Sequence, residues 1–198
     1  TCLILITPDS ERTMCTFLGT AGRINEDDID VSAVKSSEIT LLEGYLWDKG
    51  EPQKAFDKII NNSNKISMSL SDLFCVQRHK TNFLNLVKNK IDVTFANEQE
   101  ITALIDAKNF NEVITFCKEF NKLIVVTRGE KGAVAIDKNK VAECKGQKNL
   151  KIVDLTGAGD LFASGFLHGY INKKSIEESL ETGTKMASKI IQKIGARL

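Results

Sequence analysis

Short apolar runs rich in β-branched residues alternate along the chain with longer segments whose apolar residues recur every three or four positions. The runs predict strands at residues 2–7, 12–18, 38–44, 65–70, 91–96, 123–127, 133–137 and 140–144. The periodic segments predict helices at residues 52–60, 78–87, 110–120, 161–171 and 175–194, and a further helix from Glu98. This alternation is typical of an α/β fold with a mostly parallel sheet covered on both faces. No repeat or linker interrupts residues 1–198, so one domain is expected.

The first 20 residues are predicted to form a strand hairpin, followed by an α/β core at residues 21–198. Pro8, Asp9 and Ser10 supply the turn chemistry between its two apolar runs. The chain starts without Met and inside an apolar run, so it is expected to be a fragment of a longer protein. Such a fragment would expose sheet edge and apolar surface, and we expect it to be poorly soluble or inactive alone.

Composition and charge narrow the class of protein. With 42% hydrophobic and 27% charged residues, the sequence is ordinary for a globular protein. Its net charge of +1 gives no reason to expect nucleic acid or an acidic membrane as partner. No apolar run reaches membrane-spanning length, and the first residues do not resemble a signal peptide. The five cysteines are scattered and never spaced Cys-x-x-Cys, which favours free thiols in a reducing cytoplasm.

One turn near the end of the chain carries the clearest chemistry. It reads Asp154-Leu155-Thr156-Gly157-Ala158-Gly159-Asp160 and lies between residues 151–153, predicted as the tail of a buried strand, and the helix predicted from residue 161. The first N–H groups of such a helix are unpaired, and the helix dipole adds positive charge there. The small residues from Gly157 to Gly159 would let a phosphate approach the backbone closely.

Asp160 is unexpected at an anion site, because a carboxylate repels an anion. Its presence is understandable if it accepts a proton from the group that attacks the phosphate. The alternative is that Asp160 caps the helix and that the glycines only form a tight turn. From this turn alone, the two interpretations are about equal.

Two other predicted strands end in residues of interest, and ligands of parallel sheets bind at the carboxyl ends of strands. Asn97 and Glu100 would share one face at the start of a helix, although they equally fit a common capping box. Thr127, Gly129 and Gly132 follow the most apolar strand, where a simple strand-end turn is the alternative.

Taken together, these motifs resemble the ribokinase-like (PfkB-type) family of sugar and nucleoside kinases. The turn at 154–160, followed by Ser164-Gly165-Phe166-Leu167, resembles the second signature of that family. Asn97-x-x-Glu100 resembles its Asn-x-x-Glu element, and Thr127-x-Gly129-x-x-Gly132 resembles its nucleotide loop. Residues 7–14, 43–48 and 70–79 resemble the bacterial adenosine-kinase branch in particular. The likeness spans essentially the whole chain in the right order, and it departs at Leu155, where the family most often has Thr.

The resemblance implies a three-layer αβα sandwich with a mostly parallel central sheet. The N-terminal strands would be missing, and residues 1–20 would form part of a β-lid. It also implies transfer of the γ-phosphate of ATP to a primary hydroxyl, with Asp160 as base and the amides of Gly157, Ala158 and Gly159 as donors to the developing charge. Adenosine is the expected acceptor. The alternatives are a ribokinase- or fructokinase-like sugar kinase and a nucleotide-binding fragment that has lost catalysis.

The same resemblance assigns the cofactor contacts. Asn97 and Glu100 would hold water-bound Mg²⁺ near the phosphates. Thr127 and Gly129 would touch the nucleotide, and Gly132 would permit the turn into the next strand.

Further contacts are implied in the same way. Asp154 and Thr156 are suggested as ligands of a monovalent cation such as K⁺, and Ala187 with its neighbours would line the adenine side. Arg12 would neutralise the transferring phosphate, with a solvated strand charge as an equal alternative. The implied partners are ATP and a nucleoside or sugar, without nucleic acid or membrane, and a homodimer stays open. The main substrate-recognition motifs of the family lie N-terminal to where this chain begins. An oxidoreductase-type dinucleotide site is disfavoured, because no Gly-x-Gly-x-x-Gly follows a first strand.

Overall fold

The computed structural model describes residues 1–47 and 50–198. Asp48, the last residue of one stretch that resembles the adenosine-kinase branch, lies outside the described residues. The described part of the chain divides into two compact units. The first unit contains residues 1–18, 127–134 and 142–198, and the second contains residues 19–126 and 135–141. None of the helices in the described ranges combines the length and apolar character that crossing a bilayer demands.

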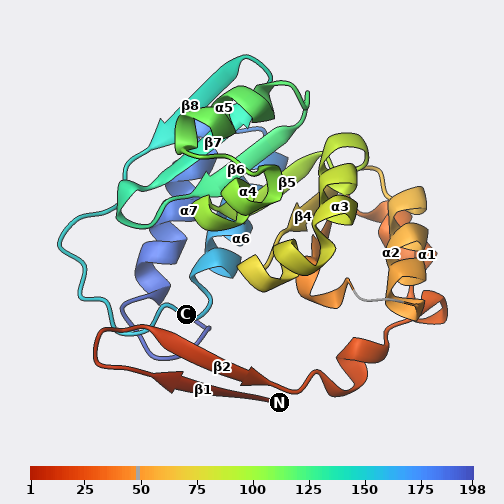
Figure 1. The fold of residues 1–198 in the computed structure, drawn as a ribbon, viewed down its shortest axis with the longest axis horizontal. Helices are drawn as coiled ribbons and strands as arrows, with labels where there is room; N and C mark the ends of the chain where they lie inside the picture. Colours follow the sequence, from red (N-terminus) through yellow and green to blue (C-terminus); the bar gives the residue numbers. More distant parts are fainter. Residues whose placement is uncertain (48–49) are drawn as a thin grey trace. The chain divides into compact units, whose positions relative to one another are not determined.

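The strands lie close to where the apolar runs predict them. In the described residues they are β1 (Cys2–Ile6), β2 (Arg12–Thr16), β3 (Thr40–Glu43), β4 (Ile66–Ser69), β5 (Val93–Asn97), β6 (Leu123–Thr127), β7 (Ala133–Asp137) and β8 (Lys140–Cys144). One sheet has the order β3-β4-β5-β6-β7-β8 (Figure 1). β3, β4 and β5 run parallel, with Thr40 opposite Ile66 and Ser67 opposite Val93. The links that join β6 to β7 and β7 to β8 are too short for a crossover, so these strands are antiparallel. The predicted α/β fold with a mostly parallel sheet is confirmed.

The helices also follow the predicted series, with two differences. Those described are α1 (Val31–Ser36), α2 (Glu51–Asn62), α3 (Leu73–Asn89), α4 (Glu98–Ile105), α5 (Phe110–Lys118), α6 (Ala158–Ile171) and α7 (Ile176–Ile190). Short 3-10 turns are η1 (Gly19–Arg23), η2 (Glu26–Asp28), η3 (Gly44–Leu46) and η4 (Gly129–Lys131). The sequence pattern does not predict α1. This short helix starts at the Asp30 side chain, which accepts two backbone N–H groups, rather than from an apolar period. α3 begins at Leu73 rather than residue 78, because Asp72 accepts the Cys75 N–H at 2.6 Å.

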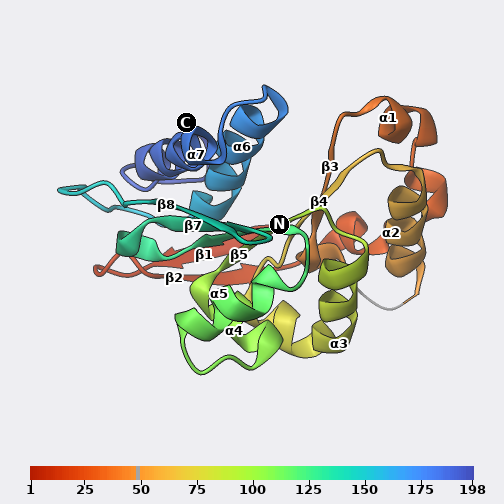
Figure 2. The ribbon, with the colours of Figure 1, turned by 90° about the horizontal axis from the view of Figure 1, so that it is seen from above.

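In the second unit, α3, α4 and α5 lie side by side (Figures 1 and 2). Their inward faces and the sheet strands form an apolar core in which Met68, Ile101 and Ile124 are completely buried. Trp47 packs edge-on against Phe56, with the ring centroids 5.3 Å apart. This packing fixes the strands whose carboxyl ends carry the predicted site residues of this unit.

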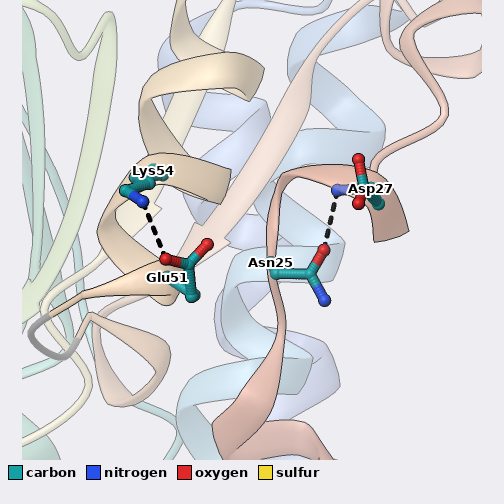
Figure 3. A network of polar contacts seen from close by, with 4 residues as sticks. All are labelled: Asn25, Asp27, Glu51 and Lys54. Atoms are coloured by element: carbon teal, nitrogen blue, oxygen red, sulfur yellow. Dashed lines mark hydrogen bonds and ion pairs between the residues drawn. The ribbon is translucent and has the colours of Figure 1, made fainter.

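Short polar contacts order the chain around the start of α2 (Figure 3). The Asn25 side-chain oxygen accepts the Asp27 N–H at 2.8 Å, and Lys54 Nζ pairs with Glu51 Oε1 at 2.7 Å. Lys58 Nζ donates to a carbonyl of η2 at 2.6 Å, which joins η2 to α2. The side chains involved are exposed or partly exposed, so we assign them a structural role of modest energy.

In the first unit, β1 and β2 pair antiparallel, which confirms the predicted hairpin. α6 and α7 pack along each other (Figure 2). Glycines permit this close approach. A Cβ at Gly165 would lie 2.9 Å from the Cα of Gly183, and one at Gly169 would lie 2.7 Å from Ser179 Oγ. The tight helix pair fixes the axis of α6 and therefore the position of its first turn.

The prediction that residues 151–153 end a buried strand is wrong, because the structure describes no strand there. Val153 instead donates its N–H at 2.8 Å to the carbonyl of Ile191, just after α7, and Ile152 stays exposed. The apolar residues that suggested a strand therefore join the segment after α7. α7 itself ends at Ile190, short of the predicted residue 194.

Candidate functional site

A cleft of about 810 Å³ lies within the first unit. It is bounded by the turn between β1 and β2, the loop after β6, the segment after β8, the start of α6 and one face of α7. Predicted site residues from two distant parts of the sequence line it: Thr127, Gly129, Gly132, Ala158 and Gly159. The fold thus brings the predicted nucleotide loop together with the turn at residues 154–160, the anion turn.

The anion turn leaves backbone N–H groups of α6 unpaired. Gly157 is the N-cap, with a φ of +78°, and it has no side chain to cap the helix. The N–H groups of Gly157, Gly159 and Asp160 have no acceptor among the described residues, whereas the Ala158 N–H bonds to the Leu155 carbonyl at 3.2 Å. The expectation of three donors from Gly157 to Gly159 therefore changes: Ala158 is engaged, and Asp160 contributes its own N–H.

The glycines of the two loops fall into two classes. A Cβ added at Gly129 or Gly159 would meet no atom within 4 Å. One added at Gly157 would lie 3.0 Å from the Cβ of Ala196, and one at Gly132 would lie 2.0 Å from the carbonyl at the end of β8. Packing therefore requires Gly132 and Gly157, while Gly129 and Gly159 leave space in which a ligand can approach the backbone.

Asp160 is the third residue of α6, and its side chain is exposed. In the part of the chain that the structure describes, no hydrogen bond joins its carboxylate to the amides of the first turn, so it closes no capping box. It follows Gly159 directly but is not itself among the residues that line the cleft. A carboxylate in this position can accept a proton from a group bound at the helix start.

Asp154 and Thr156, in the first half of the anion turn, are buried, and Asp154 is only 1% exposed. Its carboxylate accepts the N–H and the hydroxyl of Thr156, at 2.8 and 2.6 Å, and the N–H of Gly195 at 2.8 Å. Burial alone would raise the pKa of Asp154, but these bonds and the charge of Arg12 hold the pKa below its ordinary value. Arg12 is thus close enough to act on the charge of the Asp154 carboxylate, and its role toward a phosphate stays a prediction.

Asn97 and Glu100 belong to the second unit, where β5 meets α4. Asn97 Oδ1 accepts the Glu100 N–H at 2.8 Å. Glu100 accepts the Asn97 N–H at 2.9 Å and the Asn97 side-chain amide at 2.6 Å. The capping-box geometry is therefore present, and a role of the pair toward a metal ion stays a prediction.

The environment of Glu100 is unusual for a capping residue, because this side chain is only 5% exposed. Burial is the main cause that raises the pKa of Glu100; the bond from the Asn97 N–H opposes it, the nearby Asp72 and Glu43 carboxylates add to it, and the resulting pKa is about 7. A cation would relieve this accumulation of negative charge. No group of three metal-ligating side chains is found among the described residues, and binding of Mg²⁺ here stays a prediction.

The same Asn-x-x-Glu spacing recurs at the start of α5, with Asn109 and Glu112. Asn109 Oδ1 accepts the Glu112 N–H at 3.1 Å, and Glu112 accepts the Lys108 N–H at 2.8 Å. Here the glutamate is exposed. The spacing alone therefore does not distinguish a cap from a site, whereas burial beside other carboxylates at the end of a parallel strand sets Glu100 apart.

One face of α7 lines the cleft more extensively than the sequence predicts. Ala187 lines the cleft together with Thr184, Ser188 and Ile191, and their placement beside adenine stays a prediction. The Thr184 hydroxyl is buried and has no hydrogen-bond partner in the described residues. The residues on this face recur every three or four positions in the sequence, which predicts one face of a helix. The same spacing is typical of ordinary helix packing, so it does not by itself indicate a cleft.

The chain is similar to known proteins over its whole length. Residues 1–198 match the pfkB family of carbohydrate kinases. An uncharacterized sugar kinase of Archaeoglobus fulgidus is 27% identical over 199 residues, which cover 100% of this chain and 78% of that protein. A cytidine kinase of Thermococcus kodakarensis is 31% identical over 173 residues, 82% of this chain and 62% of that protein. The crystal structure of adenosine kinase from Sinorhizobium meliloti superposes with a TM-score of 0.96 at 35% identity, covering 100% of this chain and 62% of that chain. The chain thus spans about 62% of the length of the latter two proteins.

Proposed function

The chain belongs to the pfkB family of carbohydrate kinases, and we propose that the whole protein transfers the γ-phosphate of ATP to a primary hydroxyl of adenosine. The chain has a ribokinase-like α/β fold. Family membership supports the class of reaction, and the 35% identity to an adenosine kinase supports the acceptor. Because the chain spans about 62% of that relative's length, the proposal concerns the whole protein.

The observation that carries the proposal is the uncapped start of α6 beside the cleft. The unpaired N–H groups of Gly159 and Asp160 lie at the positive end of the helix dipole, and Gly157 adds a third. In phosphoryl transfer, charge spreads over the moving phosphoryl oxygens, so donors fixed in advance stabilise the transition state. The open space beside Gly159 lets the phosphoryl group come close to these donors.

Asp160 is the proposed base. Its carboxylate is exposed and makes no capping bond in the described part of the chain, so it is available to the acceptor hydroxyl. As the hydroxyl oxygen bonds to phosphorus and the ADP oxygen leaves, the hydroxyl proton passes to Asp160. A loose transition state requires this transfer only late, so a weak base suffices.

The remaining predicted residues would bind the nucleotide and its metal. Thr127 and Gly129 would contact ATP, and Gly132 would hold their loop. The face of α7 that lines the cleft would receive the adenine ring. Asn97 and Glu100 would hold Mg²⁺ through its waters. When bound, the ion neutralises charge on the phosphates.

The acceptor profile of the whole protein tests this proposal. We expect ADP release with adenosine to exceed that with other nucleosides, ribose or fructose, and Asp160→Asn serves as the inactive control. Preferred turnover of ribose or fructose would replace adenosine by a sugar. ATP binding without turnover of any acceptor would make the protein an inactive nucleotide-binding module, for which Leu155 is the sequence hint.

A further inference from the structure

The anion turn packs against the C-terminal segment, residues 191–196. Val153 and Asp154 donate their N–H groups to the carbonyl that opens this segment, at 2.8 and 3.3 Å. Near the other end of the segment, Ala196 fills the space beside Gly157, so that an added Cβ there would lie 3.0 Å from the Ala196 Cβ. The segment therefore contacts the turn at its start and at its central residue.

The Asp154 carboxylate lies between these contacts and is 1% exposed. One of its oxygens accepts the N–H and hydroxyl of Thr156 within the turn, and the other accepts the Gly195 N–H from the C-terminal segment. Hydrogen bonds to an ionised acceptor are stronger than neutral ones, and burial reduces their screening by salt. One side chain thus joins the turn and the segment through both of its oxygens.

A cation at this carboxylate would compete with donors that are already in place. Each N–H or O–H group directs its positive end at the oxygen, so a metal ion on the same oxygen would meet like charge. The positive charge of Arg12 acts on the carboxylate as well. Asp154 is therefore stabilised by donors of its own chain, and this arrangement does not call for a metal ion.

We propose that Asp154 is a positioning residue that ties Thr156 of the anion turn to Gly195 of the C-terminal segment, and so directs the amides of Gly159 and Asp160. That these amides bind a phosphate rests on the proposed function. The hydrogen bonds of Asp154 to Thr156 and Gly195 do not depend on it. The tie takes the place of the cation-binding role that the family resemblance suggests for Asp154 and Thr156.

Asp154→Asn in the whole protein tests the tie. The amide oxygen of Asn can keep the bonds to Thr156, but its amide nitrogen would face the Gly195 N–H, donor against donor. We expect the hydrogen-bonded backbone amides of the turn, those of Thr156 and Ala158, to exchange with deuterium at least about tenfold faster, measured by NMR. Amides in the middle of α6 and in β4 should keep their exchange rates.

Glu178→Gln is the matched control, because Glu178 also accepts the N–H and hydroxyl of one residue, Ser175, both at 2.9 Å. It should leave the anion turn unchanged. A second variant, Gly195→Pro, removes the donor at the other end, since proline has no N–H and cannot adopt the φ of +91° found there. Combined with Asp154→Asn it should accelerate exchange of the turn by less than the product of the two single effects, because both variants remove the same bond.

Unchanged exchange of the turn in both variants would overturn the proposal, and so would equal acceleration across the whole protein. A K⁺ titration tests the rival role: slower exchange of the turn with K⁺ in the wild type, absent in Asp154→Asn, would make Asp154 a cation ligand. We expect exchange that does not depend on K⁺.

ATP affinity completes the test. The loosened turn of Asp154→Asn should bind ATP about tenfold more weakly, and unchanged affinity would remove the positioning role. If the wild type itself fails to bind ATP, the proposed function is wrong, while the exchange rates still decide whether Asp154 ties the turn to the segment.

Discussion

α4 and α6 both carry an acid as their third residue, yet their first turns differ. At α4, the Asn97 side chain accepts the amide of Glu100, and Glu100 covers the amide of Asn97 in return. At α6, the N-cap is Gly157, and Asp160 makes no capping bond among the described residues. α4 therefore satisfies amides at its start with its own side chains, whereas α6 leaves them unpaired.

This difference separates Glu100, a capping residue, from Asp160, the candidate catalytic base. A helix that caps itself gains about 1 kcal/mol, whereas a helix with unpaired amides forgoes that stability and keeps a place for an anion. The two acids also differ in burial, because Glu100 is buried and Asp160 is exposed. We therefore propose that the same position serves two purposes in these two helices, and that the residues around the acid decide which.

The largest effect is expected for Asp160→Asn in the whole protein. Asparagine keeps the size of the side chain but cannot accept the hydroxyl proton, so turnover should fall by roughly 10²- to 10⁴-fold. ATP affinity should stay nearly unchanged, as measured by calorimetry beside steady-state kinetics. Parallel loss of binding and turnover would instead make Asp160 a structural residue of the helix start.

Glu100 should give the protein a pH-dependent stability. Its folded pKa of about 7 lies above its ordinary 4.5, so the folded state prefers the protonated form. This contribution is complete below about pH 4.5 and is lost as the pH rises through about 7, a fall of roughly 3 kcal/mol in unfolding free energy. Urea denaturation from about pH 5 to about pH 8 measures it. Glu100→Gln should remove this part of the slope, and a slope that persists in the variant would refute burial of Glu100 as its source.

Two glycine variants sharpen the comparison within the anion turn. Gly157→Ala should lower the unfolding free energy by about 1–3 kcal/mol, because φ is +78° and Ala196 is close. Gly159→Ala lies in the helix with no atom within 4 Å, so it should stabilise the protein by up to about 1 kcal/mol. It should still weaken ATP binding about tenfold, since its methyl group takes the space of a phosphate. Denaturation and ATP titration of both variants check this, and normal ATP binding by Gly159→Ala would count against the site.

The smallest effect is expected at the capped helix start. Asn97→Ala should cost about 1 kcal/mol of unfolding free energy. Asn109→Ala, which removes the same type of cap from α5, is the control and should cost a similar amount. Asn97→Ala alone should also raise the Mg²⁺ concentration needed for half-maximal turnover. An equal Mg²⁺ requirement in both variants would reduce Asn97 to a cap.

Much of the fold follows from short-range patterns in the sequence. The strands predicted at 123–127, 133–137 and 140–144 coincide with β6, β7 and β8. α1 and the start of α3 were missed because single capping side chains set them, and such side chains add no apolar periodicity. Residues 151–153 were misjudged because an apolar run does not reveal that its backbone partner lies after α7.

The motifs of the candidate site are local signals, so they could be found in the sequence, but their support could not. Asp154 reaches Gly195 across 41 positions, and no local pattern announces that bond. The contact of Gly157 with Ala196 joins residues that are similarly far apart in the sequence. The difference between Gly157 and Gly159 also depends on what lies around each residue, which only the folded chain provides.

The most direct test of the comparison is an NMR titration of the ¹⁵N-labelled whole protein with ATP in the absence of Mg²⁺. The amide signals of Gly159 and Asp160 should move and saturate together, while the Glu100 amide, already bonded to Asn97, should not move. Saturation with ATP that leaves Gly159 and Asp160 in place, or that moves the Glu100 amide instead, would contradict the account.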